Sequence, residues 1–148
     1  MSILKIKKVR ENAIIPKRAT EGSAGMDLYA CIDAPIEIKL GERVMVPTGI
    51  AIALPDANLV ALIFARSGLA VKKGINLSNS VGVVDSDYRG EVQVGLINQS
   101  QETYTLEAGE RIAQMVIMPV ALPVIEEVAE LDSTERGEGG FGSTGRKG

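Results

Sequence analysis

The densest group of residues with chemical potential is the segment G-V-V-D-S-D-Y-R-G-E, which runs from Gly82 to Glu91. Three carboxylates, a tyrosine and an arginine follow an apolar run that is typical of a strand. Asp85 and Asp87 are two positions apart, so they would share one face if the strand continued. The segment also fits a polar hairpin with a local pair between Asp87 and Arg89, and the residues alone leave both interpretations open.

The composition limits the chemistry that these carboxylates could perform. The chain has 148 residues and no histidine, which excludes Ser–His and Cys–His mechanisms and nearly all zinc sites. Acid–base chemistry must therefore use Asp, Glu, Lys or Tyr, or a metal-bound water. A net charge of −3 predicts that the chain does not bind nucleic acid over an extended surface, because a polyanion requires a basic face. The composition still permits a small anionic ligand held by a few arginines and a cation.

The segment Ala65–Gly68 combines a fixed positive charge with the start of an expected helix. Helix N-termini bind anions through free N–H groups and the helix dipole, so this segment could bind a phosphate group. Taken alone, the segment is more typical of an ordinary helix start beside an exposed arginine.

The C-terminal segment Ser133–Gly148 contains six of the 16 glycines, together with one phenylalanine and two arginines. Its G-x-G-x-x-G at Gly137–Gly142 lacks the following helix and acidic residue of a dinucleotide site, and it lacks the Lys-Ser/Thr of a P-loop. Backbone N–H groups, Arg136 and the Ser143 and Thr144 hydroxyls are nevertheless suitable phosphate partners. Simple disorder is the other interpretation of so glycine-rich a segment.

A β-sheet body must position these segments. Hydrophobic residues make up 45% of the chain and aromatic residues only 3%, so Val, Ile, Leu and Ala dominate, and the β-branched share among them favours strands. Strands at roughly 8–12-residue spacing predict an all-β sandwich or barrel. One short helix is expected at Ser67–Lys73, with Ser67 as its N-cap and Gly74 as its stop, and Ala24–Leu28 is expected to be a loop that enters a strand. The expected strands are Leu4–Val9, Ile36–Leu40, Val44–Pro47, Ile50–Leu54, Leu59–Ala65, Val81–Val84, Glu91–Ile97, Arg111–Met118 and Val124–Val128.

The run Ile112–Ile125 is apolar on both faces of a strand except at Gln114. Such a strand is expected to be buried on both sides, either at a subunit interface or as a central strand of the core. Gln114 must then find a hydrogen-bond partner.

The sequence predicts no association with a membrane. No stretch approaches the ~20 apolar residues that span a bilayer, and no signal peptide is recognisable. The single cysteine, Cys31, excludes an internal disulfide and suits a reducing compartment, so a cytoplasmic location is expected.

Taken together, these segments resemble the homotrimeric deoxyuridine triphosphatases (dUTPases). The five motifs of that family occur in the family's order and span nearly the whole chain. They are A-G-M-D-L (Ala24–Leu28), R-S-G-L-A (Arg66–Ala70), G-V-V-D-S-D-Y-R-G (Gly82–Gly90), G-E-R-I-A-Q (Gly109–Gln114) and R-G-E-G-G-F-G-S-T-G (Arg136–Gly145). Two departures are mild: Met26 stands where the family often has an aromatic residue, and Ala65 stands where proline often precedes Arg-Ser-Gly.

The resemblance implies an all-β, jelly-roll-like body with one short helix over residues 1–132. It also implies a mobile glycine-rich arm over residues 133–148, which closes over the active site. The subunits would form a homotrimer whose active sites are shared between chains. The implied reaction is hydrolysis of dUTP to dUMP and pyrophosphate by attack of water on the α-phosphorus, with Mg²⁺ on the triphosphate. This reaction limits uracil incorporation into DNA and supplies dUMP for dTMP synthesis.

By motif position, the resemblance also assigns roles to individual residues. Asp85 would orient and deprotonate the attacking water, and Asp27 would contact Mg²⁺ through water. Tyr88 would pack against the deoxyribose and exclude a 2′-hydroxyl, while Asn79 and the hairpin backbone would pair with the uracil edge. Phe141 would stack on uracil. The remaining substrate-binding residues, most of them at phosphates, would be Arg66, Ser67, Gly68, Gly82, Val84, Gln114, Arg136, Gly142 and Ser143.

Two other functions are compatible with the same resemblance. Deoxycytidine triphosphate deaminases share the fold, but their expected signature is Arg-Ser-Ser, whereas this chain has Arg66-Ser67-Gly68. A nucleotide-sensing trimer without catalysis is the second alternative. The intact Asp85, Arg136 and Phe141 argue against it as the only function.

Overall fold

The computed structural model describes residues 3–141, 143 and 145. Within these residues the chain forms ten β-strands and one α-helix. The strands are β1 (Lys5–Lys8), β2 (Met26–Tyr29), β3 (Ile36–Ile38), β4 (Arg43–Ala53), β5 (Leu59–Phe64), β6 (Ile75–Leu77), β7 (Gly82–Val84), β8 (Glu91–Asn98), β9 (Tyr104–Leu106) and β10 (Arg111–Pro119). The helix α1 (Ser67–Lys73) lies between β5 and β6. In the described part of the chain, no helix is long and apolar enough to cross a membrane.

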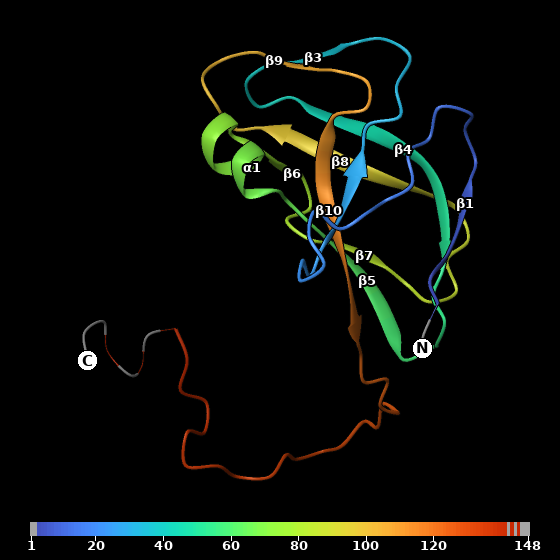
Figure 1. The fold of residues 1–148 in the computed structure, drawn as a ribbon. Coiled ribbons are helices and arrows are strands. Elements are labelled where there is room, and N and C mark those ends of the chain that lie inside the picture. Colours follow the sequence, from blue (N-terminus) through green and yellow to red (C-terminus); the bar gives the residue numbers. More distant parts are fainter. Residues whose placement is uncertain (1–2, 142, 144, 146–148) are drawn as a thin grey trace.

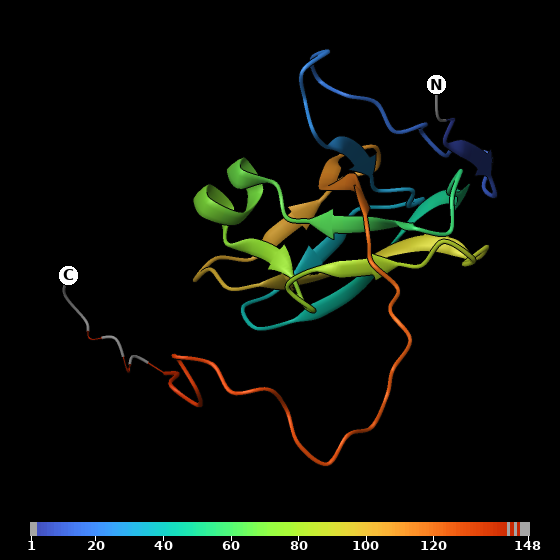
Figure 2. The same cartoon turned by 90° about the horizontal axis from the view of Figure 1, so that it is seen from below.

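The strands form two four-stranded sheets and one small two-stranded sheet. The order is β1-β4-β8-β6 in the first sheet and β2-β10-β5-β7 in the second, and β3 pairs with β9. All of these pairs are antiparallel. The two larger sheets face each other as a sandwich, with α1 at one end (Figures 1 and 2). This architecture confirms the predicted all-β, jelly-roll-like fold with one short helix.

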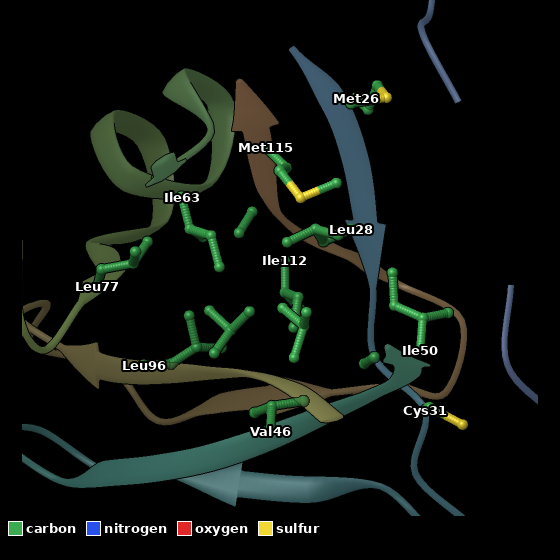
Figure 3. Close-up of a cluster of buried hydrophobic side chains, with 14 of the residues drawn as sticks. Met26, Leu28, Cys31, Val46, Ile50, Ile63, Leu77, Leu96, Ile112 and Met115 are labelled. Atoms are coloured by element: carbon green, nitrogen blue, oxygen red, sulfur yellow. The ribbon is translucent and has the colours of Figure 1, made fainter. Parts of the chain in front are cut away.

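The core fills the space between the two sheets (Figure 3). Strand β8 illustrates how the sequence builds it, because Val92, Val94 and Leu96 are buried while the intervening Gln93 is exposed. This alternation follows from the two-residue period of a strand. Ile112 and Met115 of β10 meet that face from the opposite sheet, and burial of each such side chain stabilises the fold by about 1.5–3 kcal/mol.

Strand β4 differs from the prediction of two strands, Val44–Pro47 and Ile50–Leu54. It is continuous, and its register against β8 shifts between Pro47 and Ala51. Gly49 lies within this shift with φ of 72°, a conformation that favours glycine. The proline and glycine that suggest a turn therefore mark a β-bulge, which bends the strand without ending it.

Helix α1 has the bounds predicted from the sequence, but its N-cap is different. Arg66 is the N-cap in an extended conformation, and no side chain caps the helix, so the prediction of Ser67 as N-cap was wrong. The helix ends as predicted at Gly74, which adopts φ of 68° and donates its N–H to the Ala70 carbonyl.

Three strands were not predicted as such from the sequence. The segment Ala24–Leu28 was expected to be a loop that enters a strand, and it leads into β2. β6 and β9 contain three residues each, too few to reveal an alternating pattern.

The predicted strand Val124–Val128 was wrong for this single chain. The described residues after β10 contain no helix or strand, and they run away from the body (Figure 1). The last backbone hydrogen bond between this segment and the body joins the Val120 N–H to the Asn58 carbonyl at 2.8 Å. Val124 is 95% exposed and Ile125 is 94% exposed, so two-sided burial of the whole run Ile112–Ile125 is also wrong within one chain.

Candidate active site

Asp85 stands directly after β7, at the rim of a cavity of 340 Å³ between β7 and β8. The backbone reverses direction after Asp85, because the Tyr88 N–H donates to the Asp85 carbonyl at 3.2 Å. Asp85 and Tyr88 therefore lie on the same cavity, and both are exposed. The cavity is lined by Met45, Val83, Val84, Asp85, Tyr88, Glu91, Val92 and Gln93. Nothing in the sequence pattern singled out Met45 or Gln93.

The predicted ion pair between Asp87 and Arg89 is not formed within the chain. The Arg89 guanidinium donates from Nη1 to the backbone carbonyls of Ser86 at 2.8 Å and of Tyr88 at 2.9 Å. The Arg89 side chain thus closes the hairpin by binding the backbone carbonyls of the turn and not the Asp87 carboxylate. Among the described residues, the ion pairs are Arg10–Glu91, Arg66–Asp27 and Arg111–Asp27.

The residues predicted to pair with the uracil edge are Asn79, in the turn before β7, and the hairpin that includes β7. Asn79 is exposed in that turn, and its carbonyl accepts the Val81 N–H at 2.7 Å. Gly82 and Val84 are buried, and a Cβ on Gly82 would lie 3.0 Å from the Ile63 Cβ. A side chain at position 82 would therefore crowd Ile63 of β5. Because β7 is an edge strand of its sheet, its outer backbone N–H and C=O groups have no strand partner among the described residues.

A second group of predicted site residues surrounds Asp27 on β2. Its carboxylate binds Arg66 from Nε at 2.9 Å and Arg111 from Nη1 at 3.3 Å. The Asp27 side chain is 13% exposed and the Arg66 side chain 27% exposed, so this pair is screened less than a surface pair. Nothing in the sequence pattern indicated that Arg111 joins this group, because its partner Asp27 is 84 positions away along the chain.

Gln114 has the hydrogen-bond partner that its place in an apolar strand requires. Its Nε2 donates to the Ala65 carbonyl at 2.9 Å, directly before Arg66. A Cβ on Gly25 would lie 2.6 Å from the Gln114 Oε1, so glycine at position 25 leaves room for the amide. Gln114 thus supports the junction between β5 and α1, where Ser67 and Gly68 are exposed.

The two groups lie at opposite ends of β5. The register pairs Ala61 with Val84 and Ile63 with Gly82, so Asp85 follows at the Val60 level of β5. Arg66 follows the other end of β5, six residues further along. At about 3.3 Å per residue, roughly 20 Å separate the backbones of Asp85 and Arg66 within one chain. A single subunit therefore cannot bring both residues to one phosphate group.

The carboxylates present fit a metal ion that is held mainly by its substrate. Among the described residues, no cluster of three or more His, Cys, Asp or Glu side chains could hold a metal. Mg²⁺ commonly uses one or two carboxylates together with substrate phosphates and water. Asp27 fits such a role, since a carboxylate has about four acceptor sites and the two arginines occupy only two of them.

The described part of the arm makes hydrogen bonds only within itself. Arg136 donates from Nε to the Gly139 carbonyl at 2.8 Å, and the Ser143 N–H donates to the Gly140 carbonyl at 3.0 Å. The Phe141 ring is fully exposed. None of these bonds reaches Asp85 or Asp27, and the predicted residue Gly142 lies outside the described residues.

Comparison with known proteins identifies the family. A family model described as dUTPase matches residues 11–145. The deoxyuridine 5′-triphosphate nucleotidohydrolase of Pectobacterium carotovorum is 50% identical over 139 residues, which cover 94% of this chain and 91% of that protein. The protein of the same name from Sodalis glossinidius is 52% identical over 133 residues, with 90% and 88% covered. A solved variant of the Staphylococcus bacteriophage 80alpha dUTPase with dUpNHpp superposes with a TM-score of 0.84 at 27% identity and covers 97% of this chain and 99% of that one. The chain belongs to the dUTPase family.

Proposed function

We propose that the protein hydrolyses dUTP to dUMP and pyrophosphate, with Asp85 as the base. The observation that carries this proposal is the exposed Asp85 carboxylate beside Tyr88 on a 340 Å³ cavity, in a chain without histidine. Asp85 takes a proton from a water molecule as that oxygen bonds to the α-phosphorus. The bond from this phosphorus to the bridging oxygen breaks, and pyrophosphate leaves. The reaction limits uracil incorporation into DNA and supplies dUMP for dTMP synthesis.

The free edge of β7 provides the recognition of uracil in this proposal. Uracil presents a carbonyl, an N–H and a second carbonyl along one edge, which is the pattern that strand backbone groups can pair with. Gly82 and Val84 are buried, so they contribute backbone groups and not side chains. Asn79 adds an exposed side-chain amide. Tyr88 packs against the deoxyribose.

The Asp27 group provides the phosphate contacts. Arg66, Ser67 and Gly68 contact phosphate oxygens, and Gln114 supports them through the Ala65 carbonyl. Asp27 would hold Mg²⁺ through water, and the ion would neutralise part of the triphosphate charge. Arg66 therefore has two partners, the Asp27 carboxylate and the triphosphate.

Assembly into a homotrimer brings the two groups together in this proposal. The separation of roughly 20 Å along β5 supports a site in which Asp85 and Arg66 come from different copies. The segment after β10 also needs a partner, because large apolar side chains along it are exposed. They include Leu122, Val124, Ile125, Val128 and Leu131. A cytoplasmic location completes the proposal, since Cys31 is a free thiol.

The experiment that tests the function is Mg²⁺-dependent release of pyrophosphate from dUTP, dTTP, UTP and dCTP side by side. We expect at least a hundredfold preference in kcat/KM for dUTP over dTTP and UTP. The β7 hairpin would exclude the 5-methyl group of dTTP, and Tyr88 would exclude the 2′-hydroxyl of UTP. Steric exclusion of this kind can exceed the roughly 10–200-fold discrimination that an enzyme gains from one missing methylene. Equal rates with dTTP would contradict this recognition of the base. Ammonia release from dCTP would indicate a deaminase, and binding without turnover would indicate a sensor.

Closure of the arm over bound nucleotide is a separate prediction. Ordering about ten arm residues costs on the order of 10 kcal/mol, which Phe141 on a base can offset by only about 1–3 kcal/mol. Arg136, Ser143 and backbone contacts with the triphosphate must supply the rest, so the arm should close only over a full triphosphate. We expect a non-hydrolysable dUTP analogue to slow tryptic cleavage after Arg136, measured by mass spectrometry.

Two comparisons make this cleavage experiment specific. Protection should weaken in Phe141→Ala, whereas Glu130→Ala, at an exposed polar position that precedes the arm, serves as the control. Equal cleavage rates with and without the analogue would rule out closure.

A further inference from the structure

The Glu91 carboxylate joins three separate parts of the chain beside the Asp85 cavity. Its Oε1 accepts from the Arg10 Nε at 2.7 Å and from the Gly49 N–H at 2.9 Å, while its Oε2 accepts from the Arg10 Nη2 at 3.1 Å. A two-pronged pair of this kind fixes the direction of both side chains. The hydrogen bond from Arg10 lowers the pKa of Glu91, with a smaller effect from the Gly49 N–H, so the carboxylate stays ionised.

The partners of Glu91 are themselves fixed. The N–H groups of Val9 and Arg10 donate to the Gly49 carbonyl at 2.8 and 3.3 Å, which ties the N-terminal segment to the bulge of β4. A Cβ on Gly49 would lie 2.7 Å from the Ala13 Cβ and 2.8 Å from the Cys31 Sγ. Ala13 and Cys31 therefore pack closely against the bulge that donates to Glu91.

Tyr88 packs against the backbone of Gly90 and Glu91. Its hydroxyl donates to the backbone carbonyl of Glu91 at 3.1 Å. Its ring lies over Gly90, because a Cβ there would be 2.3 Å from the Tyr88 Oη and 2.5 Å from its Cζ. Tyr88 is 46% exposed, so burial does not fix the ring. Its position depends on the space over Gly90 and on the carbonyl of Glu91.

We propose that Gly90, Glu91 and Arg10 are positioning residues that set the sugar specificity of the site. Gly90 leaves the space that the Tyr88 ring occupies, and the Arg10–Glu91 pair fixes the carbonyl that binds its hydroxyl. This inference rests on the proposed function, in which Tyr88 packs against the deoxyribose. None of the three residues acts on the phosphorus, so their loss changes discrimination between dUTP and UTP more than turnover.

Gly90→Ala is the sharpest test, because the backbone at position 90 is not in the left-handed region and alanine can adopt it. Only the Tyr88 ring must move. We expect the ratio of kcat/KM for dUTP to that for UTP to fall at least about tenfold, while kcat with dUTP stays within about threefold. Gly22→Ala is the matched control, since a Cβ at position 22 has no atom within 4 Å. An unchanged ratio in a Gly90→Ala protein that retains its thermal unfolding temperature would overturn the proposal.

A Tyr88→Ala background separates this proposal from the proposed function. Tyr88→Ala alone should lower the dUTP to UTP ratio, and adding Gly90→Ala should change it no further, because the ring is already gone. A further loss in the double variant would show that Gly90 acts independently of Tyr88 and would overturn the inference. If Tyr88→Ala left the ratio unchanged, the assigned role of Tyr88 would fail first, and the inference with it.

The contribution of the N-terminal segment is tested by Arg10→Met. Methionine preserves much of the side-chain length but removes both hydrogen bonds to Glu91, so we expect a fall in the dUTP to UTP ratio in the same direction as in Gly90→Ala. Arg43→Met is the control, because Arg43 is also exposed but lies at the start of β4. Arg10→Lys, which keeps the charge but not the two-pronged geometry, should rescue only part of the ratio. An unchanged ratio in Arg10→Met would remove the N-terminal segment from the proposal.

Discussion

Asp85→Asn is expected to lower the turnover of dUTP by about 10²–10⁴-fold while binding of the nucleotide is retained. The asparagine amide has nearly the same size as the carboxylate, but it cannot accept a proton from the attacking water. Because Asp85 is exposed after the end of β7, the substitution leaves the core and the hairpin hydrogen bonds in place. Pyrophosphate release gives kcat, and titration calorimetry with a non-hydrolysable dUTP analogue gives the affinity.

Asp87→Asn is the matched control for this experiment. Asp87 carries the same functional group two residues further along and is exposed, and it makes no ion pair within the described chain. Its replacement should leave turnover within about threefold of the parent. Turnover of Asp85→Asn within about tenfold of the parent would exclude Asp85 as the base, and a large loss in Asp87→Asn would move that role to Asp87.

Local patterns in the sequence predicted the parts of the fold that depend on neighbouring residues. Helix α1 has its predicted bounds because the stop at Gly74 is a local backbone preference. Strand β8 was predicted well because its alternation spans eight residues. Val124–Val128 has the same β-branched character but no strand, since a strand also needs a partner edge and the described chain offers none beside it.

In the site, contacts between residues close in the sequence could be predicted, whereas contacts between distant residues could not. Asp85 and Tyr88 lie on one cavity because a four-residue turn joins them, and the motif spacing already indicated this. Asp27, Arg66 and Arg111 meet only through the pairing of β10 with both β2 and β5. The pair of Arg10 with Glu91 spans 81 positions. The sequence indicated that Gln114 needs a partner, but its choice of the Ala65 carbonyl depends on the β10–β5 register.

A mixture of two impaired variants is expected to regain activity that neither has alone. Arg66→Gln removes the charge for the triphosphate but keeps a polar partner for Asp27. Asp85→Asn removes the base. Suppose that one site takes Asp85 and Arg66 from different copies. When equal amounts of the two variant chains assemble at random, each of these two positions in a site is unmutated with a probability of one half. The product is roughly one quarter of the sites fully intact in the unsorted mixture, and about one third once trimers of a single variant have been removed. Co-expression with two different tags, purification through both, and pyrophosphate release measure this recovery.

The opposite result has an equally definite meaning. If Asp85 and Arg66 of one chain served the same site, every site in the mixture would carry one defect, and the activity would equal the mean of the separate variants. Mixing Asp85→Asn with the double variant Asp85→Asn/Arg66→Gln is the control, because no arrangement of those chains contains an intact base. The separation along β5 is fixed by the Ala61–Val84 and Ile63–Gly82 pairs and cannot shorten without unpairing β7. Recovery in the first mixture but not in the control would therefore establish that catalysis belongs to the assembly and that each subunit carries two incomplete halves of different sites.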